Sequence, residues 1–220
     1  MKKDLTERIF YRVTNSVLIF LMVNLYFLLM NFLFFACLLL FEPRIENTII
    51  YLVALIPTGP AIAACFSAMG ELIKEGEISA TAAFFKGYKQ NFKISLQFWL
   101  TQLLLILIFS FNYFYIRETM NLTFLLPLLL ALLAGILFTN LYAFPILTRF
   151  NITVKNLWII SISSLYKYWQ RSLLNAAITV TFLFLSFHHP LIIILSFASV
   201  IPYLIMYNLR NFLKELEDYY

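Results

Sequence analysis

The sequence predicts an all-α membrane protein, a polytopic bundle of about six transmembrane helices with both chain ends on the cytoplasmic side. Three observations predict this class. Of the 220 residues, 62% are hydrophobic and only 12% are charged. The apolar residues form long runs, and the basic residues gather in alternate connections. Because a soluble domain carries about 25% charged residues, we expect lipid to surround most of the chain. Residues 1–220 are predicted to form a single membrane domain.

Six apolar runs are the predicted spans, at 16–41, 48–70, 94–115, 122–148, 172–187 and 190–209. A spanning helix needs about 20 residues, and the first four runs qualify directly. The first is also longer than the apolar part of a signal peptide, which has about 7–15 residues. The last two form one stretch broken only at His188, His189 and Pro190. A single helix of that length would far exceed the membrane core, so we predict a hairpin turning at these residues.

The basic residues predict the orientation of these spans. Fourteen of the 16 Lys and Arg residues lie in the N-terminal segment, in the connections 71–93 and 149–171, and in the C-terminal tail. Only Arg44 and Arg117 lie on the opposite side. Cytoplasmic connections are rich in Lys and Arg, so both ends are predicted to be cytoplasmic. The net charge of +5 is then explained by topology and lipid headgroups, and no nucleic-acid partner is expected.

Each long cytoplasmic connection is predicted to hold a short amphipathic helix, over 77–92 and 153–170, that could dock a cytosolic partner. Ser79 and Thr153 are suitable N-caps, and apolar residues follow at helical spacing. The hairpins 48–115 and 122–187 resemble a weak parallel repeat of the kind that transporters carry, although any two inward-looping hairpins look alike. The candidate docking residues are Ser79, Phe84, Phe85, Lys86, Tyr88, Lys89, Asn91 and Lys93 in the first helix, and Thr153, Lys167, Trp169 and Arg171 in the second.

The second span combines prolines with small residues. Its prolines remove backbone donors and predict a kink, and its small residues fall on one face, where another helix can approach closely. One interpretation is a kinked, tightly packed central helix. The other is an unwound point that lines a substrate path. The residues concerned are Pro57, Gly59, Pro60, Ala63, Ser67 and Gly70.

Polar residues also occur inside the predicted spans, where amides and hydroxyls need partners. They either bond helix to helix or line a path for a polar solute. No Asp, Glu, Lys or Arg lies deep in a span, which argues against a proton-coupled pump. The candidates are Asn24, Asn31, Gln97, Thr101, Gln102, Asn140, Asn175 and Thr179.

Signatures of catalysis and metal binding are missing from the sequence. It contains no Gly-rich nucleotide loop, no Gly-x-Ser-x-Gly elbow and no His-Glu-x-x-His motif, so we expect neither an enzyme nor a cofactor. His188 and His189 are interpreted as turn residues, because adjacent histidines rarely converge on one ion. Cys37 and Cys65 should lie at different depths and are interpreted as packing residues rather than a disulfide.

One stretch resembles a known family. The string Gly59-Pro60-Ala61-x-Ala-Ala, followed by Gly76-Glu77-x-Ser79 and Phe84-Phe85-Lys86-x-Tyr88-Lys89-x-Asn91-Phe92-Lys93-x-Ser95-Leu96, resembles the YesL-like family of bacterial integral membrane proteins. The chain departs from that pattern in having few glycines and many phenylalanines.

The resemblance implies a multi-pass protein of the bacterial plasma membrane whose biochemical activity is unassigned. Such proteins are often encoded near carbohydrate ABC importers, which implies an accessory or permease-like component connected with carbohydrate uptake. Importer subunits or other membrane proteins would then be its partners. The alternative is a structural or regulatory membrane partner with no solute path.

Overall fold

A computed structural model of the protein describes residues 2–42, 44–119, 123–188 and 190–217. These residues form α-helices, two 3-10 turns and short connections without any strand, so the predicted all-α class is confirmed. The helices are α1 (Lys2–Met30), α2 (Phe32–Leu40), α3 (Thr48–Ala54), α4 (Thr58–Glu75), α5 (Ala80–Thr119), α6 (Leu126–Leu147), α7 (Val154–Lys167), α8 (Trp169–His188) and α9 (Pro190–Glu217).

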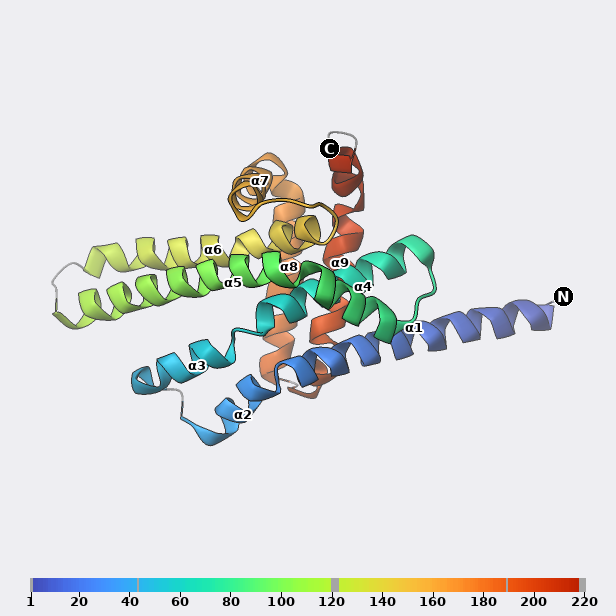
Figure 1. Cartoon of the computed structure of the whole chain (residues 1–220), viewed down its shortest axis with the longest axis horizontal. Helices are drawn as coiled ribbons and strands as arrows, with labels where there is room; N and C mark the ends of the chain where they lie inside the picture. The colour runs from blue at the N-terminus through green and yellow to red at the C-terminus, as the bar shows by residue number, and fades with distance from the viewer. Residues whose placement is uncertain (1, 43, 120–122, 189, 218–220) are drawn as a thin grey trace.

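Helix α4 lies at the centre of the fold and packs against α1, α5, α6 and α9 (Figure 1). Most of its residues from Thr58 to Leu72 are buried. Small side chains dominate this stretch, and they allow several helices to reach one short helix at once. Its C-terminal end is closed by Gly76, whose positive φ of 79° is a conformation that glycine adopts without steric cost.

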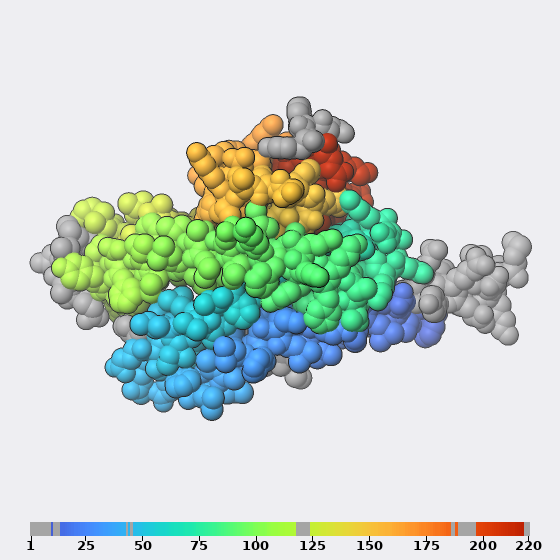
Figure 2. Space-filling view, in the orientation of Figure 1, coloured from blue at the N-terminus to red at the C-terminus, as the bar shows by residue number. Residues whose placement is uncertain are grey.

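Two helical hairpins extend from this centre. Helices α5 and α6 pack side by side, and their connected ends project away from the other helices (Figures 1 and 2). Helices α8 and α9 form the second hairpin, which runs steeply across the direction of α5 and α6 (Figure 1). The predicted break between 187 and 190 is therefore present, although His189 itself lies outside the described residues.

Three helical segments are long and apolar enough to cross a membrane, namely Thr48–Glu75, Ala80–Arg117 and Leu126–Leu147. A fourth arises if the bent pair Thr14–Met30 and Phe32–Leu40 counts as one span. The predicted spans at 172–187 and 190–209 are not among these candidates within the described residues. A membrane protein with three or four candidate spans is thus supported, and six spans with both ends in the cytoplasm remain a prediction.

The predicted first span, 16–41, is not one straight helix. It breaks at Asn31, where α1 ends and α2 leaves with a bend of 62°. The Asn31 side chain donates from Nδ2 to the carbonyl of Phe27 over 2.9 Å. The same carbonyl also accepts from the backbone nitrogen of Asn31 at 3.1 Å, so the side chain shares this acceptor with the backbone. Hydropathy could not reveal this break, because the sequence is apolar on both sides of it.

The predicted helix 77–92 and the predicted span 94–115 are in fact one continuous helix, α5, of 40 residues. This corrects the expectation of a short amphipathic helix in the first long connection. No proline lies between Ala80 and Thr119, so nothing removes a backbone donor there. A helix of this length is about 60 Å long, so its N-terminal part would extend beyond a membrane core of about 30 Å.

The second predicted amphipathic helix is a separate element. Thr153 precedes α7 with extended backbone, and its hydroxyl accepts a hydrogen bond from the backbone nitrogen of Asn156 over 3.4 Å. Thr153 is therefore the N-cap that the sequence predicted. The helix ends at Lys167, so Trp169 and Arg171 belong to α8 instead. The two connections consequently differ in structure, although their sequences follow a similar plan.

Aromatic side chains fill much of the core between α4, α5, α6 and α9. The rings of Phe66 and Phe144 stack with centroids 5.9 Å apart, and Phe98 meets Phe144 edge-on at 6.0 Å. A second cluster joins α1, α4 and α5 around Val23, Met69 and Phe84. Ring pairs of this kind add to the stabilisation that burial alone supplies.

Candidate functional site

The clearest irregularity in the protein is a pair of helix breaks that meet. The second break separates α3 from α4 at residues 55–57. Pro57 and Pro60 have no backbone N–H, so the usual hydrogen-bond ladder cannot continue through them. The carbonyl of Leu55 is compensated instead, because it accepts hydrogen bonds from the backbone nitrogen of Thr58 at 3.1 Å and from Nε1 of Trp99 in α5 at 2.8 Å.

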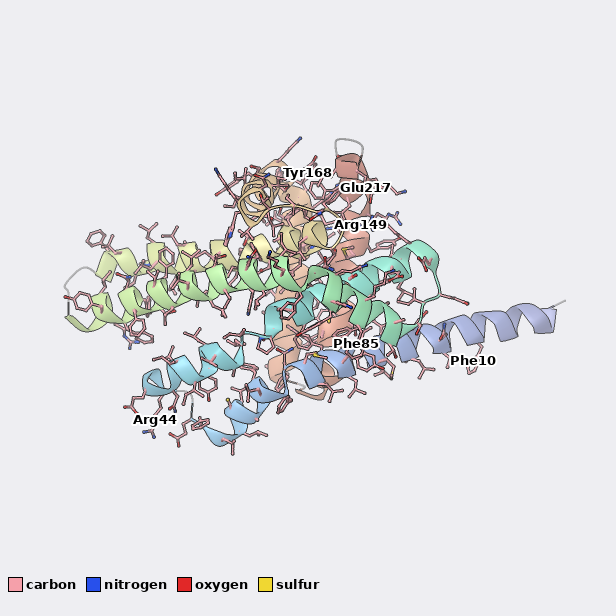
Figure 3. All side chains as sticks on the ribbon, viewed as in Figure 1. Phe10, Arg44, Phe85, Arg149, Tyr168 and Glu217 are labelled. Carbon is pink, nitrogen blue, oxygen red and sulfur yellow. The ribbon has the colours of Figure 1, made fainter. Side chains whose placement is uncertain are left out.

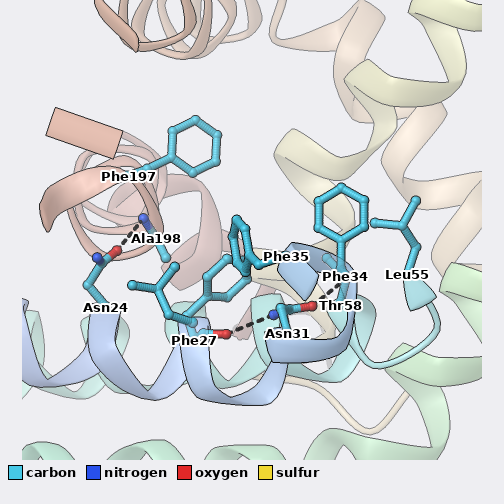
Figure 4. Close-up of a pocket in the computed structure, with 10 residues that line it drawn as sticks. Asn24, Phe27, Asn31, Phe34, Phe35, Leu55, Thr58, Phe197 and Ala198 are labelled. Carbon is cyan, nitrogen blue, oxygen red and sulfur yellow. Dashed lines mark hydrogen bonds between the residues drawn. The ribbon is translucent and has the colours of Figure 1, made fainter. Parts of the chain in front are cut away.

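Thr58 and Asn31 join the two breaks to each other. The Thr58 hydroxyl donates to Oδ1 of Asn31 over 2.6 Å, and the bond is buried. Asn31 at the same time donates to Phe27. The residue that interrupts the first helix is thus bonded to the first residue of α4, as Figure 4 shows. This bond fixes the position of one bend relative to the other.

A cavity of about 210 Å³ lies beside this junction. Its polar groups are already engaged, since Asn24 Oδ1 accepts from the backbone nitrogen of Ala198 in α9 at 2.9 Å and Asn31 and Thr58 bond to each other. None of the described residues that line it has an ionisable side chain. The lining residues are Asn24, Phe27, Leu28, Asn31, Phe34, Phe35, Leu55, Thr58, Phe197 and Ala198 (Figure 4).

The small residues of α4 lie where other helices approach most closely. A Cβ atom added to Gly59 would collide with the side chain of Trp99. Ser67 lies against Gly87 of α5, where an added Cβ would come within 2.5 Å of the serine Cβ. Gly70 meets Met206 of α9 in the same way. The predicted face thus contacts two helices, and Ala63, which completes it, is fully buried.

Most of the predicted intramembrane polar residues bond to neighbouring helices. Gln102 donates from Nε2 to the hydroxyl of Thr139 in α6 at 3.0 Å. Asn175 in α8 accepts at Oδ1 from Asn208 in α9 over 2.7 Å. The Thr101 hydroxyl lies 3.3 Å from the donating Nε1 of Trp158 in α7.

Three members of the predicted polar set behave differently. Thr179 donates to the carbonyl of Asn175 within its own helix at 2.9 Å. Gln97 is exposed on α5. Asn140 is partly buried, and its Oδ1 has no partner among the described residues.

Several residues that contact the small residues of α4 or the polar residues were not identified from the sequence. Trp99, Gly87 and Asn208 were not among the candidate site residues. Trp99 and Gly87 lie in a helix whose packing face cannot be identified from its own pattern. Asn208 lies at the end of the last predicted span. Polar side chains are common at exposed positions of this kind, so the asparagine did not indicate a contact between helices.

Residues 20–113 match a family model described as "Protein of unknown function, DUF624". The chain is thus similar to the DUF624 family over this segment, which is less than half of its 220 residues. YesL-like proteins are members of that family, so the resemblance seen in the sequence is confirmed. No curated protein and no solved structure matches the chain.

The DUF624 segment contains the whole junction of the two breaks. It begins inside α1, continues through α2, α3 and α4, and ends near the C-terminal end of α5. Asn31, Thr58, Gly59 and Trp99 all lie within it. The matched sequence therefore contains α2, α3 and α4 with parts of α1 and α5, and α9 packs on α1 and α4 from outside it.

Within this DUF624 segment, the candidate docking residues at the start of α5 lie on different faces. Phe84 is fully buried, Asn91 is nearly so, and Tyr88 is half-buried. Ser79 directly precedes α5, and its carbonyl accepts from the backbone nitrogen of Ala83. Lys86 pairs with Glu71 of α4 at 3.4 Å. The residues whose side chains remain accessible to a partner are Phe85, Lys86, Lys89 and Lys93.

The second docking region, outside the DUF624 segment, has exposed apolar side chains on α7 and at the start of α8, which we call the stripe. The side chains of Ile159, Ile162, Tyr166, Trp169 and Leu173 are exposed. Ile159, Ile162 and Tyr166 recur at helical spacing on α7, and Trp169 and Leu173 do so on α8, so each helix has an exposed apolar face. Lys167 and Arg171 lie close to them in sequence, and both contact the ring of Tyr168 with centroid distances of 5.4 Å.

Proposed function

We propose that this protein is an accessory subunit of the bacterial plasma membrane, connected with carbohydrate uptake, that acts by binding other proteins rather than by catalysis. The observation that carries this proposal is that buried polar side chains form hydrogen bonds between different parts of the protein. Gln102, Asn175 and Thr58 each bond to a residue of another helix, so these groups hold the protein together instead of meeting a solute. The connection with carbohydrate uptake rests on the family resemblance.

The stripe on α7 and α8 supplies a surface for such a partner. Tyr166 is 80% exposed and Trp169 is 59% exposed, and large exposed aromatic side chains are enriched where proteins bind one another. Lys155 and Lys167 are exposed beside the stripe. The chemistry of this surface therefore suits an apolar groove with acidic residues at its rim, on an importer subunit.

Affinity purification with a matched pair of variants tests this proposal. The tagged protein is purified from membranes in mild detergent, and the recovered proteins are quantified by mass spectrometry. Tyr166→Ala with Trp169→Ala should reduce the recovery of importer subunits on the order of tenfold or more, because interface aromatics contribute about 2 kcal/mol or more each. The control is Leu39→Ala with Ile49→Ala, which removes exposed apolar side chains from α2 and α3.

Two results together would contradict the proposal. The first is that no importer subunit is recovered with the unaltered protein. The second is that deletion of the gene leaves sugar uptake unchanged. An equal loss of recovery in both double variants would place the binding surface elsewhere on the protein.

A permease-like role is the second candidate, and one observation favours it. Gln102 Oε1, Asn140 Oδ1 and Asn175 Nδ2 are buried and have no hydrogen-bond partner among the described residues. Unpaired polar atoms at membrane depth are costly, and a passing polar solute could satisfy them. Uptake of a labelled sugar by liposomes that contain only this protein would support the permease role and exclude the accessory one.

A further inference from the structure

A cleft of about 490 Å³ lies where the ends of α4, α6 and α9 come together. Lys74 stands in the last turn of α4, and Arg149 follows the end of α6. Arg210, Asn211 and Lys214 lie on the last turns of α9, with Glu217 at its final residue. Figure 3 shows Arg149 and Glu217 close together at this place.

The cleft has a strong excess of positive charge. Among the described residues, four cationic side chains line it together with one carboxylate, that of Glu217. That carboxylate is shared, because its Oε1 accepts from Arg149 Nη1 at 3.1 Å and lies 3.7 Å from Lys74 Nζ. Lys214 makes no ion pair with any described residue, and Arg210 packs its guanidinium over the ring of Tyr207 at 4.3 Å.

Helix ends alone do not account for this arrangement. Basic residues often lie near the C-terminal end of a helix, where the helix dipole is negative. A residue with that role interacts with its own helix and can remain in water. Here the side chains come from three elements and line one cavity. The Arg149 side chain is only 9% exposed. Burial of a guanidinium is costly unless enough negative charge surrounds it, and among the described residues the carboxylate that pairs with Arg149 is shared with Lys74.

We propose that this cleft binds a phosphate-bearing anion. Guanidinium groups form paired hydrogen bonds to phosphate oxygens, and lysines add point charge. The charge distribution along the sequence assigns all four cations to the cytoplasmic side. Basic pockets at that side of membrane proteins suit the headgroups of anionic phospholipids. The phosphate can come from such a headgroup or from a free phosphate ion, and the experiment separates these sources.

The first arm of the experiment uses lipid. The protein is purified in detergent, incubated with mixed micelles of phosphatidylcholine and phosphatidylglycerol, and examined by native mass spectrometry for retained lipid. We expect retained phosphatidylglycerol to exceed phosphatidylcholine. Arg210→Gln with Lys214→Gln should reduce that retention on the order of tenfold, because each basic residue near the membrane surface attracts anionic lipid.

A matched double variant controls for general surface charge. Lys89→Gln with Lys93→Gln removes the same charge from exposed positions on α5, outside the cleft, and should leave retention unchanged. Glu217→Gln gives a change of opposite sign, because removing the one carboxylate that lines the cleft in the described part of the chain should strengthen retention. Circular dichroism spectra that match those of the unaltered protein show that each variant is folded.

The second arm uses inorganic phosphate. Its effect on the thermal unfolding midpoint is compared with that of chloride at equal ionic strength. Stabilisation by millimolar phosphate that the cleft variant loses, without preference for phosphatidylglycerol, identifies free phosphate as the ligand. Equal loss of binding in the cleft variant and the α5 variant would overturn the proposal, and so would the absence of any effect in both arms.

Discussion

The hydroxyl of Thr58 donates a buried hydrogen bond of 2.6 Å to Oδ1 of Asn31, and this bond ties together two breaks in different helices. Asn31 ends α1, and Thr58 begins α4. The segment between them, α2 and α3 with their connection, leaves the core at both breaks. Its helices pack mainly on each other, so the position of this hairpin depends on a few contacts at its base.

Removing the Thr58 hydroxyl should therefore destabilise the protein. Thr58→Val keeps the side-chain shape and leaves the buried Oδ1 of Asn31 without its donor, at an expected cost of about 1–3 kcal/mol. The measurement is the thermal unfolding midpoint in detergent. The control is Thr181→Val, at an exposed position on α8, which should unfold within experimental error of the unaltered protein. Identical midpoints for the two variants would show that the bond contributes nothing.

Gly59 and Gly135 make a second matched pair. Gly59→Ala forces a methyl group into the side chain of Trp99, and overpacking of this kind costs about 1–3 kcal/mol. Gly135→Ala meets no atom within 4 Å and should stabilise α6 by up to about 1 kcal/mol, because alanine favours helices over glycine. Thermal unfolding of both variants checks the opposite signs. A Gly59→Ala protein as stable as the parent would contradict the close contact with Trp99.

The hydrogen bond between Asn175 and Asn208, 2.7 Å long, predicts an energetic coupling across the α8–α9 hairpin. We expect Asn175→Leu and Asn208→Leu to be non-additive, with a coupling of about 1 kcal/mol in a double-mutant cycle. The readout is the free energy of unfolding in mixed micelles. Asn208→Leu combined with Thr181→Val should instead be additive. Full additivity in the first cycle would be incompatible with this helix pairing.

Cysteine labelling in intact cells tests the predicted orientation. Replacing Cys37 and Cys65, both buried, with alanine provides a background without thiols. We expect a cysteine introduced by Gln90→Cys to react only with a membrane-permeant reagent. Glu46→Cys should react with an impermeant one, because these exposed positions are predicted to face opposite sides of the membrane. The reverse labelling pattern would show that the orientation is opposite to the one predicted.

The sequence predicted those properties that depend on local composition and short spacing. The all-α class, the Thr153 cap and the break between 187 and 190 all follow from residues within a few positions of each other. The bend at Asn31 and the continuity of α5 were missed. The break at Asn31 lies within an apolar run, where hydropathy is the same on both sides. In the case of α5, a change from charged to apolar residues was interpreted as a boundary, although no proline was there to end the helix.

The candidate site shows the same limit. The sequence by itself determined that the second span contains prolines and small residues, and that another helix can therefore pack closely against it. The tertiary structure alone decided which helices use that capacity, by bringing Trp99 and Gly87 to α4 and Asn31 to Thr58. The physical reason is that hydropathy records how each residue interacts with lipid. A hydrogen bond or a close contact depends instead on two residues distant in the chain, and their meeting is specified only when the helices pack.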